Sequence, residues 1–261
     1  MEIVVAVKQV PDLVEELEID DSGKALDRTF LKYRLNEFDE HALEEALLLK
    51  EKHGGKVTVI ALDTAEVEET LYTCLAKGAD RAIKVTGNFD NGVDSREAAN
   101  ILREVLSSTP YDLILTGVQA ADDRDGQLGP LLASYLKLPH LSVVSGIELA
   151  QGGRALTANQ EHSGGIVAEF EVTLPALLGV QAARETPRYA PVSKVRQMMK
   201  ATKIEELAAA KSALDSVTPI RRLSKPESAG RAEMLEGDAE EISSKLIAIL
   251  DQRGLLKGSI K

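Results

Sequence analysis

Short apolar runs alternate with amphipathic stretches over the first two-thirds of the chain. The apolar run at residues 3–7 predicts a buried strand, and apolar positions at helical spacing predict a helix over 37–53 that the glycines after it would end. Further strands are predicted at 57–62, 82–85, 113–116 and 141–144, and helices at 64–77, at 95–107 and up to about residue 136. Such alternation predicts an α/β fold with a doubly wound, mostly parallel sheet.

The pattern changes after Gly146. Alternating residues at 147–160 and 165–174, with glycine turns between them, predict a small antiparallel extension, and 176–180 reads as one more buried strand. Beyond Glu185 the sequence is polar, with a helical segment near Glu205 and a final helix at about 240–252. We therefore expect an α/β domain at residues 1–190 and, at 191–261, a C-terminal arm that packs on a partner because it is too poor in apolar residues to fold alone.

Composition excludes several classes of function. The 261 residues carry a formal charge of −11, which repels phosphate backbones, so we expect no nucleic-acid partner. No apolar run is long enough for direct membrane insertion, and the N-terminus reads as a strand and not as a signal peptide. A single cysteine, Cys74, reads as a small core residue and suits a reducing compartment, so we expect a cytoplasmic protein.

Familiar catalytic signatures are missing from the sequence. It contains no phosphate-binding Walker loop, no G-x-G-x-x-G and no G-x-S-x-G, and its four histidines are scattered. The expectation is that no side chain is catalytic and that no metal is bound.

The loop at 117–130 is the stretch most able to hold a ligand. It follows a buried strand and opens a helix, whose first N–H groups suit a phosphate, and Gly126 and Gly129 permit close backbone approach. Its acidic residues could cap the helix or bind a ribose or a cation. From these residues alone, a nucleotide site and a capped surface loop both remain open.

A basic segment lies between Arg184 and Lys203. Six basic residues face one acidic residue there, and Val192, Val195, Met198 and Met199 add apolar surface. Such a segment can dock an acidic partner, and a solvated connector is the alternative.

Several motifs, in order, resemble one family. They are V-A-V-K-Q-V-P-D at 5–12, N-E-F-D-E-H-A-L-E-E-A at 36–46, A-K-G-A-D-R at 76–81, the loop at 117–130, L-P-A at 174–176 and P-R-Y-A at 187–190. Together they resemble the β subunits of electron-transfer flavoproteins.

The resemblance implies a heterodimer with a homologous α subunit, which would hold most of the redox FAD, and an adenine nucleotide in this subunit: AMP, or a second FAD in the electron-bifurcating branch. The implied fold is a Rossmann-like, adenine-nucleotide-binding sheet. The implied cofactor-binding residues are Ala6, Asn36, Glu37, Phe38, Asp39, Leu62, Gly117, Val118, Gln119, Ala120, Asp122, Asp123, Arg124, Asp125, Gly126, Gln127 and Leu128. The implied partner-recognition loop, near 188–200, includes Tyr189, Val192, Lys194, Val195 and Arg196.

By the same resemblance, the protein is an electron carrier and not a classical enzyme. It would shuttle electrons from a flavin dehydrogenase, such as an acyl-CoA dehydrogenase, to an acceptor such as a quinone oxidoreductase. The bifurcating alternative would oxidise NADH on the second FAD. The loop at 122–125 differs from the D-G-D-T of bifurcating relatives, which favours AMP. Leu13 replaces an aromatic flavin contact, Glu37 replaces the proline of N-P-F, and Gln160 and Ser163 replace charged residues beside the glycine turn.

Two readings outside that scheme remain. The chain could be a stand-alone ATP- or AMP-binding protein of the stress type, although the long polar tail argues against a monomer. It could also be a structural partner subunit that has lost its nucleotide.

Overall fold

The structure, a computed structural model, describes residues 1–29, 31–64, 67–89, 92–123, 125–209, 220–226, 232 and 234–256. The chain divides into two compact units, Met1–Arg222 and Leu223–Lys261. The first unit thus extends past residue 190, where the sequence analysis ended the α/β domain. The two units are described separately below.

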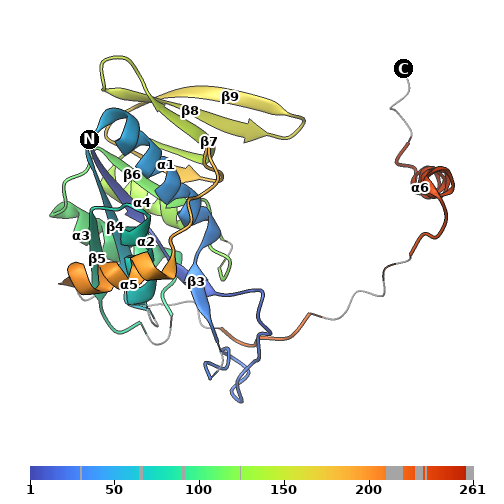
Figure 1. Cartoon of the computed structure of the whole chain (residues 1–261), viewed down its shortest axis with the longest axis horizontal. Helices are drawn as coiled ribbons and strands as arrows, with labels where there is room; N and C mark the ends of the chain where they lie inside the picture. Colours follow the sequence, from blue (N-terminus) through green and yellow to red (C-terminus); the bar gives the residue numbers. More distant parts are fainter. Residues whose placement is uncertain are drawn as a thin grey trace. The chain divides into compact units, whose positions relative to one another are not determined.

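A nine-stranded sheet forms the centre of the first unit, in the order β11-β5-β4-β1-β6-β10-β7-β8-β9 (Figure 1). Its strands are β1 (Glu2–Ala6), β4 (Lys56–Leu62), β5 (Arg81–Thr86), β6 (Leu113–Gly117), β7 (His140–Leu149), β8 (Ala155–His162), β9 (Ile166–Thr173), β10 (Ala176–Val180) and β11 (Glu205–Ala208). The pairs from β11 to β7 are parallel, and only β7-β8 and β8-β9 are antiparallel. The predicted fold class, with its small antiparallel extension, is confirmed.

Helices cover both faces of this sheet. On one face α1 (Glu37–His53) and α2 (Val67–Lys77) pack Leu43, Leu47 and Leu71 against Ile3 and Val5. On the other face α3 (Ser95–Ser107) and α4 (Leu128–Leu136) pack Ile101, Leu102 and Leu132 against Val4 and Ile114. Successive β1 residues thus enter opposite cores, because side chains alternate across a strand. This two-sided burial explains why the strand reads as an uninterrupted apolar run.

The strand order reverses next to β1. From β1 the chain moves outward through β4 and β5, and it then returns to place β6 on the other side of β1. In doubly wound sheets, ligands bind at the carboxyl ends of the strands beside such a reversal. A small second sheet, β2 (Gln9–Pro11) paired with β3 (Tyr33–Leu35), leads the chain from β1 to the start of α1 at that same edge.

The sequence analysis misplaced elements after residue 140. The strand predicted at 141–144 continues as β7 to Leu149, so no break occurs at Gly146. The helical segment predicted near Glu205 is wrong: those residues form β11, which pairs with the edge of β5, and Arg81 binds Glu205 across the pair at 2.7 Å. Pairing with the edge of β5 outweighed the helical propensity of these residues. A helix, α5 (Val192–Ala201), lies instead within the predicted recognition loop and packs on α2.

The second unit contains one helix among its described residues, α6 (Ala239–Gln252), as predicted. Asp238 caps it by accepting hydrogen bonds from the N–H groups of Glu240 and Glu241. None of its residues is buried. In the described part of the chain, no helix is long and apolar enough to span a membrane.

Candidate nucleotide site

The candidate site lies at the carboxyl edge of the sheet, beside the strand-order reversal. Ala6 and Leu62 end β1 and β4, and Gly117 ends β6. The start of α1 reaches this edge through β2 and β3, since Asn36 N–H donates to the Lys8 carbonyl at 2.9 Å. The residues implied by the resemblance therefore come from four separate segments and converge on one edge.

Asn36, which is 1% exposed, joins the start of α1 to the loop after β6. Its Nδ2 donates to the Gln119 carbonyl at 2.9 Å, and its Oδ1 accepts the Ala121 N–H at 3.2 Å. An amide can both donate and accept, so one side chain satisfies two backbone groups of the loop. A carboxylate at this position could not replace the donor.

Asp39 makes the second junction. Its Oδ2 accepts the Lys8 N–H at 2.8 Å, and its Oδ1 accepts the Gly117 N–H at 2.9 Å. One carboxyl group thereby holds the ends of β1 and β6 together across the reversal. Burial raises the pKa of Asp39 to about 7, although both hydrogen bonds favour the ionised form.

Gly117 is required by the closeness of α1. A Cβ built there would lie 2.5 Å from Asp39 Oδ1 and 2.7 Å from the Phe38 Cβ. Any side chain would push the helix start away from β6. Glycine at this point lets the start of α1 lie directly against the backbone of β6.

Lys8 is a site residue that the sequence analysis did not select. Its Nζ lies 2.8 Å from Asp122 Oδ1 and 2.9 Å from Asp123 Oδ2, so it links the end of β1 to the acidic loop. Burial lowers the pKa of Lys8, but Asp122 and Asp123 outweigh this effect and raise it. Two signals in the sequence marked it: its place directly after a strand that ends at the reversal, and its place in the V-A-V-K-Q-V-P-D motif at 5–12.

The end of the loop is tied to two helices. Asp125 Oδ1 accepts the Ser95 hydroxyl at 2.9 Å and the Gln127 N–H at 3.1 Å. Gly126 adopts a left-handed conformation with φ +64°, and α4 begins at Leu128 without a side-chain cap. Because Pro130 has no N–H, the amides of Leu128 and Gly129 are the ones at the start of α4 that can receive an anionic ligand.

The other cofactor-binding residues that the resemblance implies differ in how exposed they are. Ala120 is buried, Phe38, Leu62, Val118, Gln119 and Leu128 are half-buried, and Glu37 and Gln127 are exposed. Arg124 lies outside the described residues.

Among described residues, no group of His, Cys, Asp and Glu could hold a metal ion. Cys74 is fully buried, as predicted, and burial raises the pKa of its thiol to about 12.

The predicted docking residues lie apart from this edge, on and before α5. Tyr189 is 80% exposed and Val192 is 58% exposed, and neither belongs to the core. Lys194 and Arg196 are exposed, whereas Val195 is half-buried. The structure thus presents an apolar and basic surface on a helix that packs against α2.

Comparison with known proteins identifies the family. Residues 25–212 match the model of the electron transfer flavoprotein domain. The chain is 37% identical to the electron transfer flavoprotein subunit beta of Methylophilus methylotrophus, over 97% of this chain and 98% of that protein. It is 31% identical to the subunit beta of Bacillus subtilis, over 96% and 97%, and 30% identical to the Caffeyl-CoA reductase-Etf complex subunit CarD of Acetobacterium woodii, over 98% and 100%.

These similarities cover nearly the whole chain. A β subunit implies an α subunit as its partner, and the family implies association with flavin. The chain therefore belongs to the electron transfer flavoprotein family, among its β subunits, and functions in electron transfer.

Proposed function

We propose that this subunit binds AMP at the edge formed by Asn36, Asp39 and the loop at 117–128, while the redox FAD is held mainly by the α subunit. The observation that carries the proposal is the pair of side-chain junctions at the strand-order reversal: Asn36 to the loop and Asp39 to β1 and β6. They hold the loop after β6, which leads into α4, against the start of α1 at the carboxyl edge of the sheet. The flavin would carry the electrons, and the residues of this chain would bind and orient the cofactors.

The residues present suit an adenine nucleotide. A phosphate would be received by the uncapped start of α4 and by Lys8, since each favours negative charge. Gly117 and Gly126 give the ligand access to backbone groups. Asp122 and Asp123, which are both exposed, are positioned to accept ribose hydroxyls if Lys8 turns to the phosphate.

The second part of the proposal concerns partners. Tyr189, Val192 and the basic residues Lys194 and Arg196 would dock a flavin dehydrogenase, such as an acyl-CoA dehydrogenase, with a quinone oxidoreductase as the downstream acceptor. The support is their exposure on α5 and their positive charge within a chain of net charge −11. We place this electron carrier in the cytoplasm.

The third part concerns the C-terminal arm. Apolar residues of α6 recur at helical spacing, at Ile242, Leu246, Ile249 and Leu250, yet no residue of the helix is buried. Such a helix gains little from folding alone and needs an apolar surface to cover. We assign that surface to the α subunit.

A nucleotide count tests the proposal. The chain is co-expressed with its α subunit, the purified complex is denatured, and the released FAD and AMP are quantified. One FAD and one AMP per heterodimer are expected. A complex with flavin but without AMP would refute the AMP site, and one without flavin would contradict the assignment of the cofactor.

A bifurcating subunit is the second candidate. The observation that favours it is the 30% identity, over 98% of this chain, with the subunit of the Caffeyl-CoA reductase-Etf complex. It predicts two FAD and no AMP per heterodimer, and flavin reduction by NADH. The acidic loop at 122–125 is the sequence feature that makes AMP our first choice.

A further inference from the structure

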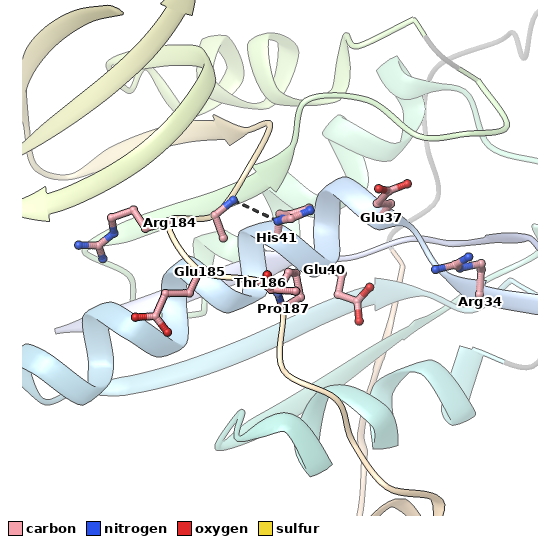
Figure 2. A pocket seen from close by; sticks show the side chains of 9 residues that line it. Arg34, Glu37, Glu40, His41, Arg184, Glu185, Thr186 and Pro187 are labelled. Carbon is pink, nitrogen blue, oxygen red and sulfur yellow. Dashed lines mark hydrogen bonds between the residues drawn. The ribbon is translucent and has the colours of Figure 1, made fainter. Parts of the chain in front are cut away.

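A strap of residues 183–188 connects β10 to the docking surface, and it lies along α1. It contains Ala183, Arg184, Glu185, Thr186, Pro187 and Arg188, and it ends directly before Tyr189. Figure 2 shows the strap beside α1, with His41 directed toward it. An open hollow of about 560 Å³ lies between the strap, the first turns of α1 and Arg34.

Acidic residues of α1 hold the strap by ion pairs at both ends. Arg184 donates its N–H to Glu45 at 2.6 Å, and its guanidinium also contacts Glu45 and Glu148. Arg188 donates its N–H to Glu44 at 2.9 Å, and its guanidinium binds Glu44 at 2.7 Å and Glu51 at 2.6 Å. Between them, the Ala183 N–H donates to His41 Nδ1 at 3.1 Å (Figure 2).

Two of the acidic residues in these contacts, Glu44 and Glu45, are buried. The side chain of Glu45 is 0% exposed and that of Glu44 is 3% exposed. Buried carboxylates without partners are strongly unfavourable, so Arg184 and Arg188 are confined to these positions. Glu45 and Glu44 also accept the backbone N–H groups of the two arginines, which fixes the course of the main chain as well as the side chains.

Lys77 fastens the strap from the other side. It ends α2, its side chain is 4% exposed, and its Nζ lies 2.7 Å from Glu40 while donating to the Arg188 carbonyl. The residue that precedes Tyr189 is thus held at its N–H by α1 and at its carbonyl by α2. Both backbone groups of Arg188 are fixed by buried charges from two helices.

We propose that Glu44 and Lys77 are positioning residues for partner recognition: they fix Arg188 and so preorganise Tyr189 and the start of α5 for docking. The inference rests on the proposed docking function of that surface. A buried charge network costs desolvation and is weak evidence for stability alone, which points to a role in specifying geometry. An ordered docking surface binds more tightly because less entropy is lost on association.

The experiment uses the heterodimer purified with its α subunit and two variants, Glu44→Gln and Lys77→Met. Glu104→Gln, which removes an exposed ion pair on α3, is the matched control. Hydrogen exchange is followed in the peptide that contains residues 189–196. Each variant is expected to raise its exchange by about tenfold or more, since a charged hydrogen bond is lost, whereas β1 and β6 keep their protection. Unchanged exchange in the peptide, or a rise across the whole unit, would overturn the proposal.

Steady-state kinetics separates positioning from general damage. With an acyl-CoA dehydrogenase as the reductant, the variants should raise the KM for the flavoprotein about tenfold with kcat and AMP content unchanged, and Glu104→Gln should change neither. An unchanged KM beside raised exchange would overturn the positioning role. If the wild-type complex is not reduced by this dehydrogenase, the proposed partner is wrong, and exchange alone decides whether the strap orders the surface.

Discussion

Asp39 shows how one buried residue makes the stability of the fold depend on pH. Its pKa is about 7 in the fold and about 3.9 in an unfolded chain, so ionisation is more costly when the chain is folded. Its contribution to the free energy of unfolding is fully present below about pH 4 and is lost as the pH rises to about 7, by up to about 4 kcal/mol.

Asp39→Asn is expected to remove this dependence. Urea unfolding of the two complexes at pH 5 and pH 8 measures it: the stability of the wild type relative to the variant should fall at pH 8. A difference that does not change with pH would contradict the expectation. Asp27→Asn is the control, because Thr29 lowers the pKa of that exposed aspartate and any effect has the opposite sign.

Replacing Lys8 tests whether its positive charge, beside Asp122 and Asp123, contributes to AMP binding. Lys8→Met leaves Asp122 and Asp123 without their shared cation and removes a candidate phosphate ligand. The affinity of nucleotide-stripped complex for AMP, measured by titration calorimetry, should fall by up to about fivefold, because partly exposed ion pairs contribute up to about 1 kcal/mol. Lys24→Met, in an exposed loop, should leave it unchanged. Equal affinities of Lys8→Met and wild type would exclude Lys8 from the site.

The elements of the first unit differ in how far the sequence could predict them. Helix α1 was predicted at its observed bounds, because its apolar spacing and the glycines at 54 and 55 are local signals. Strand β11 was not, because a four-residue polar segment becomes a strand only through the free edge of β5. The site residues differ in the same way. The family motifs indicated Asn36 and Asp39 as cofactor-binding residues, whereas the role of Lys8 became visible only from its contacts with Asp39 and Asp122 in the structure.

The end of β6 lies close to the start of α1. Gly117→Ala should displace Phe38 and Asp39, because the added Cβ would lie 2.5 Å from Asp39 Oδ1. We expect loss of most AMP from the purified complex, measured by nucleotide release. Gly146→Ala is the control, since its Cβ would lie 3.1 Å from Arg184 Cγ and 3.7 Å from Asn159 Nδ2, and neither residue belongs to the candidate nucleotide site. Full AMP occupancy in Gly117→Ala would show that this junction does not shape the site.

At the scale of the whole molecule, our proposal gives the two units separate roles: nucleotide binding for the first and packing on the α subunit for the second. All described buried hydrophobic residues lie at or before Ile204, so the core of the first unit does not depend on residues 223–261. Deleting 223–261 should therefore leave the sheet folded and weaken the heterodimer. Assembly can be measured by analytical ultracentrifugation with the α subunit.

A point variant distinguishes two roles of α6: packing on the α subunit through its apolar face, or only linking to it. Leu246→Glu places a charge among the apolar residues of α6, whereas Ser244→Glu places one on the opposite face, given 100° per residue. If α6 covers an apolar surface of the α subunit, the first variant should weaken assembly at least tenfold, since burying a charge in place of leucine costs well over 1.4 kcal/mol. The second should leave assembly unchanged. Equal assembly of both would mean that the arm reaches the partner by other residues, because an amphipathic helix can gain stability only from the face that it buries.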